Sequence, residues 1–136
     1  MNQFEILEHP ADVGFHAWGN TAEELFRESA LALADIAFPA GDGTDEYPIA
    51  VSGHDYESLM VNWLDEILYV FDSAKFAPYD FRVDEVSTTA IRAHLIGEPR
   101  DAVHHPWKVI VKAITYHGIE VVQRNGRWES RVFVDV

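Results

Sequence analysis

Apolar and polar residues alternate near the start of the chain, which is the pattern of a half-buried strand. Within residues 13–18, Val13, Phe15 and Ala17 fall on one side. A side-chain period of two predicts a strand here, and residues 4–11 predict another before it. The opposite side of residues 13–18 and the position just before them carry Asp12, Gly14, His16 and Trp18.

A helical spacing replaces the alternation after residue 20. Thr21 with Glu24 three residues later fits a capping box, so the first helix is expected to begin there. The segment 38–43 contains a proline and two glycines and should end this helix. Residues 47–52 are then expected to form a third strand.

The second expected helix has Asp55 as its N-terminal cap. Its apolar residues recur at helical spacing and form a stripe that should face the core: Leu59, Trp63, Leu64, Ile67, Leu68 and Phe71. We therefore expect Trp63 to be buried. Asp65 and Glu66 lie off the stripe and are expected to face solvent.

The remainder of the chain carries β-branched and aromatic residues in strand-like runs. Strands are expected at 81–86, 89–97, 109–124 and 128–136, and Asn125-Gly126 is a strong signal for a two-residue hairpin loop. The predicted order is β-β-α-β-α-β-β-β-β. This order favours one α+β domain over residues 1–136, with a mostly antiparallel sheet on which two amphipathic helices pack.

Composition narrows the possible functions. The chain has 136 residues, of which 48% are hydrophobic, and it has no cysteine, so disulfides and thiol chemistry are excluded. Acidic residues number 23 against 10 Lys and Arg, giving a net charge of −13. Because nucleic acids bind mainly through cationic groups, direct RNA or DNA binding is not expected. A cation or a basic protein is a better-matched partner. Taken alone, however, the charge is explained more simply as a means of keeping the protein in solution.

The chain also carries no sign of membrane insertion or export. No apolar run approaches the roughly 18 residues of a membrane span. Residues 1–5 lack the basic and apolar regions of a signal peptide. A cytoplasmic location is the simplest expectation.

The last predicted strand ends in oxygen ligands. Asp135 stands one residue before Val136, whose carbonyl or terminal oxygen is also available. Such hard oxygen donors suit Ca²⁺, Mg²⁺ or Mn²⁺. On spacing alone this signal is weak, and an ordinary solvated strand end is the favoured interpretation of both Asp135 and Asp12.

The predicted hairpin allows Asp135 to be placed on its neighbouring strand. With Asn125 and Gly126 as the loop, Asp135 should pair near Tyr116, and Lys112 should lie on the same face roughly 13 Å further along. A bulge at Gly118, or Asp12 lying between them, would bring Lys112 and Asp135 together. A paired Lys112 is expected, since apolar residues flank it on that face.

Five segments in order then match a known family. They are residues 9–14, 24–26, 59–69, 112–117 and 133–136. Together they resemble the archease family, over essentially the whole chain. Pro10 departs from the threonine that the family usually has, which removes a hydroxyl and a main-chain donor beside Asp12.

The resemblance implies a function. Archeases are accessory proteins that activate an RtcB-type RNA ligase, promoting its GTP-dependent guanylylation and multiple turnover in tRNA splicing or RNA repair. The family's metal site corresponds to Asp12, Asp135 and Val136, with Ca²⁺ the leading ion and Mg²⁺ or Mn²⁺ as alternatives. Lys112 corresponds to a further functional position.

Two other functions are compatible with the sequence. One is a metal-dependent phosphoester hydrolase that uses Asp12, Asp135, Lys112 and His117. His9 is a further functional candidate. The other is a general chaperone-like binding module. The resemblance favours a non-enzymatic activator over both, and the sequence gives no oligomeric state.

Overall fold

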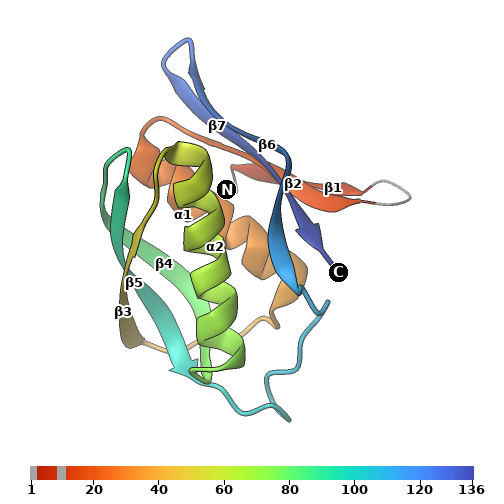
Figure 1. The fold of residues 1–136 in the computed structure, drawn as a ribbon. Coiled ribbons are helices and arrows are strands. Elements are labelled where there is room, and N and C mark those ends of the chain that lie inside the picture. Colours follow the sequence, from red (N-terminus) through yellow and green to blue (C-terminus); the bar gives the residue numbers. More distant parts are fainter. Residues whose placement is uncertain (1–2, 9–11) are drawn as a thin grey trace.

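The fold is that of a computed structural model, which describes residues 3–8 and 12–136. Helices and strands follow each other in the predicted order (Figure 1). The elements are β1 (Phe4–Glu8), β2 (Val13–Gly19), α1 (Ala22–Ala37), β3 (Asp45–Ser52), α2 (Tyr56–Asp72), β4 (Phe76–Val86), β5 (Ala90–Pro99), β6 (Ala113–Arg124) and β7 (Arg127–Asp135). The predicted α+β class is confirmed.

The described strands form two antiparallel sheets. The first has the order β1-β2-β7-β6, and the second has the order β3-β5-β4. The last strand, β7, therefore lies between β2 and β6, and brings the end of the chain beside the start of β2 (Figure 1). This pairing of distant segments creates the candidate site.

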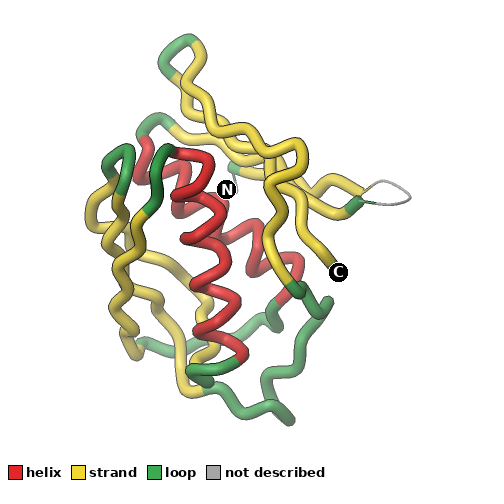
Figure 2. The backbone as a smooth tube through the Cα atoms, in the orientation of Figure 1, coloured by secondary structure: helices red, strands yellow, loops and turns green. Residues whose placement is uncertain are grey.

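The two helices lie between the sheets and supply most of the core (Figure 2). Helix α1 packs against β2 and β4, and α2 packs against β6 and β3. Trp63 is fully buried as predicted, and its Nε1–H donates to the Phe26 carbonyl oxygen at 3.0 Å. That bond satisfies the indole donor, which would otherwise be costly to bury.

Both helices begin where the sequence indicates. The Thr21 hydroxyl accepts the Glu24 main-chain N–H at 3.1 Å, while the Glu24 carboxylate accepts from Asn20 N–H at 2.6 Å. At the second helix, Asp55 and Ser58 form a reciprocal capping box. These side chains satisfy main-chain donors that a helix start leaves unpaired.

Three strands begin two or more residues away from the predicted position, and the first is β3, which begins at Asp45 and not at residue 47. Strand β1 ends at Glu8, and residues 9–11 of the expected 4–11 strand lie outside the described residues. Strand β4 begins at Phe76, not at residue 81, because a register shift after Pro78 lets the strand continue past the proline.

Residues 109–112 are the third difference, because they precede β6 instead of belonging to it. The Lys108 main-chain N–H donates to the Ala37 carbonyl oxygen at 2.8 Å, and Val111 is buried in the core. This segment therefore packs against the helices, and the pairing with β7 starts only at Ala113.

Candidate functional site

Asp12 and Asp135 meet at one corner of the four-stranded sheet. Val13 pairs with Val134 at the last position of the β2–β7 ladder. Asp12 directly precedes Val13, and Asp135 directly follows Val134, so the two aspartates stand at the next position across the strands. Both side chains are exposed.

The alternation of β2 and β7 sets the direction of these side chains. Phe15, Val132 and Val134 are buried and point into the core. Asp135 is one residue beyond Val134, so its side chain leaves the opposite, outer face. Asp12 shares that face because it precedes Val13 by one residue. The outer face of the sheet therefore carries both carboxylates.

A wide bulge in β6 corrects the predicted register. The hairpin register holds from Arg124 and Arg127 up to Glu120 and Arg131. Beyond it, residues 116–119 of β6 stand opposite a single residue of β7, and pairing resumes at Thr115 with Phe133. The predicted pairing of Asp135 with Tyr116 is wrong, because Asp135 pairs with Ala113.

The bulge makes Lys112 a main-chain neighbour of Asp135, but the expectation that their side chains share a face is wrong. Ala113 pairs with Asp135, so Lys112 is one residue out of phase and its side chain lies on the α2 side of the sheet. The Lys112 main-chain N–H donates to the Asp135 carbonyl oxygen at 2.8 Å. This link is between main-chain atoms, and the Lys112 side chain is exposed. The expectation that burial would force Lys112 into an ion pair is therefore wrong, since its ammonium reaches solvent.

The Phe133 ring lies between Gly14 of β2 and Gly118 of the β6 bulge, and these contacts hold the strands of the site together. A Cβ atom at Gly14 would lie 2.7 Å from Phe133 Cδ1 and 2.3 Å from the Val132 carbonyl oxygen. A Cβ atom at Gly118 would lie 3.3 Å from Cδ2 and Cε2 of the same ring. Gly118 has a φ of 69°, which glycine adopts readily. The ring thus spans from β2 to the bulge, two residues from Asp135.

Asp65 lies near the site, and the expectation that it faces solvent is wrong. It is half-buried, not solvated, and its Oδ1 accepts the Ile114 main-chain N–H at 3.0 Å. Burial raises the pKa of the Asp65 carboxyl, and the Ile114 N–H opposes that shift. This bond ties α2 to β6 two residues after Lys112. No spacing in the sequence marks it, because it depends on which strand the helix contacts.

The remaining candidate residues are Val136, His117 and His9. Val136 is exposed directly after Asp135. His117 is exposed on the bulge, where its main-chain N–H donates to Thr115 Oγ1 at 2.9 Å. His9 lies outside the described residues, as does Pro10. The structure therefore gathers Asp12, Asp135, Val136 and Lys112, while His117 lies further along β6.

The donor set at this corner fits a hard divalent cation. It offers two carboxylates and the Val136 main-chain carbonyl oxygen, and Ca²⁺, Mg²⁺ and Mn²⁺ prefer such oxygens. Two neighbouring carboxylates repel each other, so a cation between them relieves that repulsion. In the described part of the chain, no three or more His, Cys, Asp or Glu side chains group closely enough to hold a metal ion. Solvent would complete the coordination.

Further along the outer face, His16 of β2 contacts a glutamate on each of the two neighbouring strands. Its Nε2 lies 3.0 Å from Glu129 Oε1, and its Nδ1 lies 3.3 Å from Glu5 Oε1. The hydrogen bond from His16 lowers the pKa of Glu129, with a smaller contribution from Arg127. This cluster links β1, β2 and β7 and so helps to fix the strands that carry the aspartates.

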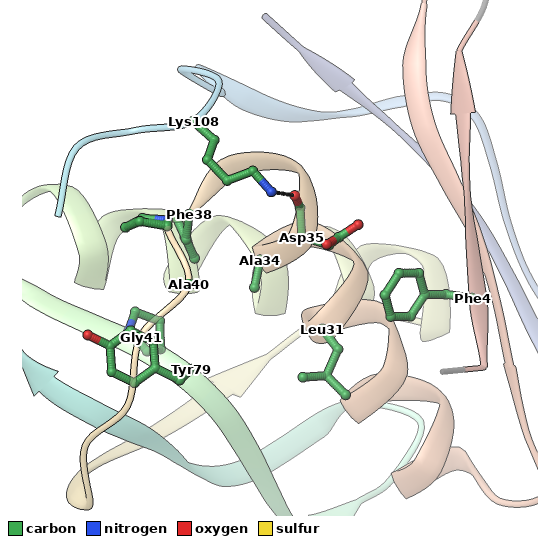
Figure 3. A pocket seen from close by; sticks show the side chains of 11 residues that line it. Phe4, Leu31, Ala34, Asp35, Phe38, Ala40, Gly41, Tyr79 and Lys108 are labelled. Atoms are coloured by element: carbon green, nitrogen blue, oxygen red, sulfur yellow. Dashed lines mark hydrogen bonds between the residues drawn. The ribbon is translucent and has the colours of Figure 1, made fainter. Parts of the chain in front are cut away.

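A hollow at the C-terminal end of α1 lies apart from this corner (Figure 3). It has a volume of about 290 Å³, and Lys108 Nζ donates to the Asp35 carbonyl oxygen at its edge at 2.6 Å. None of the predicted site residues lines it. In residues 3–8 and 12–136, no helix is long and apolar enough to cross a membrane.

These features define a small α+β protein whose final strand completes an acidic corner beside its second strand. The Archease protein family matches residues 4–136, and the chain belongs to this family. Protein archease from Methanosarcina acetivorans is 34% identical over 140 residues, covering 98% of this chain and 96% of the relative.

Two solved structures share the fold. The solution structure of Methanobacterium thermoautotrophicum protein 1598 has a TM-score of 0.70 and 27% identity, with full coverage of both chains. The crystal structure of an archease from Thermotoga maritima, described as a possible chaperone, has a TM-score of 0.64. It is 20% identical and covers 96% of this chain and 94% of its own, so it supports the fold alone.

Proposed function

We propose that this protein activates an RtcB-type RNA ligase in the cytoplasm, promoting GTP-dependent guanylylation and multiple turnover in tRNA splicing or RNA repair. The observation that carries the proposal is the pairing of Val13 with Val134, which Asp12 and Asp135 flank, in a chain that matches the archease family over residues 4–136. The protein itself acts as an accessory factor and not as an enzyme.

In this proposal Asp12, Asp135 and the Val136 carbonyl oxygen hold one divalent cation, with Ca²⁺ the leading candidate and Mg²⁺ or Mn²⁺ as alternatives. The bound cation supplies a positive charge that can neutralise phosphate oxygens. The Lys112 main-chain N–H holds the Asp135 carbonyl oxygen, and the Lys112 ammonium adds a positive charge on the α2 side of the same strand end. The Phe133 ring keeps β2, β6 and β7 in register so that the carboxylates stay adjacent.

The exposure of the corner supports an accessory role. Both aspartates are exposed at the outer face of the sheet, and Lys112 is exposed on the α2 side, so a partner protein can approach these residues directly. An open site with two carboxylate side chains encloses no substrate and excludes no water. It suits the positioning of an ion at a partner's surface better than independent hydrolysis, which the alternative enzyme function requires.

Ligation at limiting enzyme tests the proposal. The RtcB-type ligase from the same organism is incubated with GTP, Mn²⁺ and an excess of RNA ends, with and without this protein. We expect several ligations per ligase molecule only in its presence. Asp135→Asn should abolish the stimulation, whereas Asp45→Asn, an exposed aspartate of the other sheet, should retain it. No stimulation by the unaltered protein would refute the proposal.

The same samples distinguish the two alternatives. A hydrolase would release phosphate from a phosphoester in the absence of the ligase. A general chaperone would suppress aggregation of an unrelated protein such as heat-denatured citrate synthase, and Asp135→Asn would leave that activity intact. An activator shows neither behaviour and depends on Asp135.

A further inference from the structure

A groove runs between α2 and the segment that leads into β6. Its volume is about 560 Å³. Helix α2 contributes one wall, and residues 107–113 contribute the other. The residues that line it are Asp65, Leu68, Tyr69, Asp72, Ser73, Trp107, Ile110, Val111, Lys112 and Ala113.

Large apolar side chains project at this groove. Ile110 is 62% exposed and Tyr69 is 57% exposed, from opposite walls. Exposed aromatic and aliphatic side chains that share one hollow are typical of protein interfaces, where they become buried anchors. The groove is therefore equipped to bury an apolar side chain of a partner.

The charges in the groove select the kind of partner. Asp65 and Asp72 line the wall formed by α2, and Lys112 on the other wall is the third charged side chain, so the lining is acidic by one charge in a chain of net charge −13. Asp65 is half-buried and accepts one main-chain N–H, and burial raises the pKa of its carboxyl. A lysine or arginine from a partner would offset that burial. An enzyme that binds RNA and GTP needs a cationic surface to do so.

The groove ends close to the acidic corner, on the other side of the sheet from the carboxylates. Lys112 lines the groove, and its main-chain N–H donates to the Asp135 carbonyl oxygen at 2.8 Å. A partner larger than the groove can therefore extend past Lys112 to the end of β7. The two features can be covered by one partner in one orientation.

We propose that this groove is the docking surface for the RNA ligase, and that it receives an apolar side chain of the ligase flanked by lysine or arginine. This inference rests on the proposed function. The apolar contact with Tyr69 and Ile110 supplies affinity, and the pairing with Asp65 and Asp72 sets the orientation. The bound ligase then meets the Asp12–Asp135 pair.

Binding of labelled ligase to variants tests the docking surface. Ile110→Ser removes an exposed anchor and should raise the Kd about tenfold, as loss of an interface anchor typically does. Asp72→Lys should also raise the Kd about tenfold at low salt and reduce its salt dependence, because an attractive charge becomes repulsive. Val103→Ser is the matched control, since Val103 is 82% exposed and does not line the groove.

The outcomes separate this inference from the proposed function. If the unaltered protein neither binds nor stimulates the ligase, the proposed function fails. If it does both, and Ile110→Ser and Asp72→Lys bind as tightly as the unaltered protein, the groove is not the docking surface. Sedimentation of the protein alone gives a further check. A dimer that Ile110→Ser dissociates would assign the groove to a second copy of this chain and overturn the inference.

Discussion

Replacement of Gly14 by alanine should destabilise the protein and weaken the candidate site, because the added methyl group would collide with the neighbouring strand at Phe133. The added Cβ atom would lie 2.3 Å from the Val132 carbonyl oxygen and 2.7 Å from Phe133 Cδ1. The ring could rotate, but the carbonyl oxygen belongs to the β2–β7 ladder and cannot move without separating the strands. The strands therefore have to shift next to the position of Asp135.

The size of the effect follows from the rigidity of that contact. Forcing one extra carbon into a packed region costs about 1–3 kcal/mol. For a chain of this length, each kcal/mol corresponds to a decrease of about 3–5 °C in Tm. Urea unfolding and thermal unfolding, followed by circular dichroism, measure the free energy and the Tm. The affinity for Ca²⁺, measured by calorimetry on the folded variant, should fall at the same time.

Gly126→Ala provides the control for this prediction. Gly126 has a φ of 76° in the hairpin loop, and the Cβ atom that alanine adds there would have no other atom within 4 Å. Its replacement should cost about 1 kcal/mol through backbone strain alone and leave Ca²⁺ affinity unchanged. If Gly14→Ala were as stable as the unaltered protein and bound Ca²⁺ equally well, the contact between Gly14 and the Phe133 ring would have no part in holding the site.

Three further predictions concern buried or shared polar groups. Ser130→Ala should cost about 1–3 kcal/mol in urea unfolding by leaving the Ser29 hydroxyl, 2.9 Å away in the core, without its partner, and the double alanine variant should be closer to the unaltered protein. Equal losses in the single and double variants would contradict this. Asp65→Asn keeps the acceptor for the β6 main-chain N–H but removes a carboxylate whose pKa burial raises, so at pH 7 it should unfold at an equal or higher urea concentration, whereas Asp65→Ala should unfold at a lower one. The hydrogen bond from His16 lowers the pKa of Glu129, so its stabilising contribution is complete above the usual glutamate pKa of about 4.3 and is lost as the pH falls through the lowered value. His16→Gln should make the free energy of unfolding fall less steeply below pH 5, and an unchanged slope would refute the role of that bond.

Much of the fold was predictable because its elements have strong local signals. The Thr21 and Asp55 caps mark both helix starts, and Asn125-Gly126 marks the hairpin that sets the first part of the β6–β7 register. The division into two sheets was not predictable, because the strand periodicity is the same in either sheet. Residues 109–111 have the composition of a strand, but they lie beyond the last β6–β7 pair, and Val111 is buried in the core instead.

The site was only partly predictable for a related reason. The alternation of β2 and β7 indicates that Asp12 and Asp135 occupy strand ends, but only their pairing brings them together. The bulge around Gly118 depends on where the Phe133 ring lies, and it moves the partner of Asp135 from Tyr116 to Ala113. The contact made by Asp65 could not be predicted, because its partner is a main-chain group of a distant strand.

The most direct test of the account is a double-mutant cycle on Ca²⁺ affinity, measured by isothermal titration calorimetry. Asp12→Asn, Asp135→Asn and the double variant are compared with the unaltered protein, with Asp45→Asn as the control. If the two aspartates share one ion, each single variant should lose nearly as much affinity as the double variant, and the control should lose none. Unchanged Ca²⁺ affinity in either single variant, or losses that simply add, would contradict a shared site.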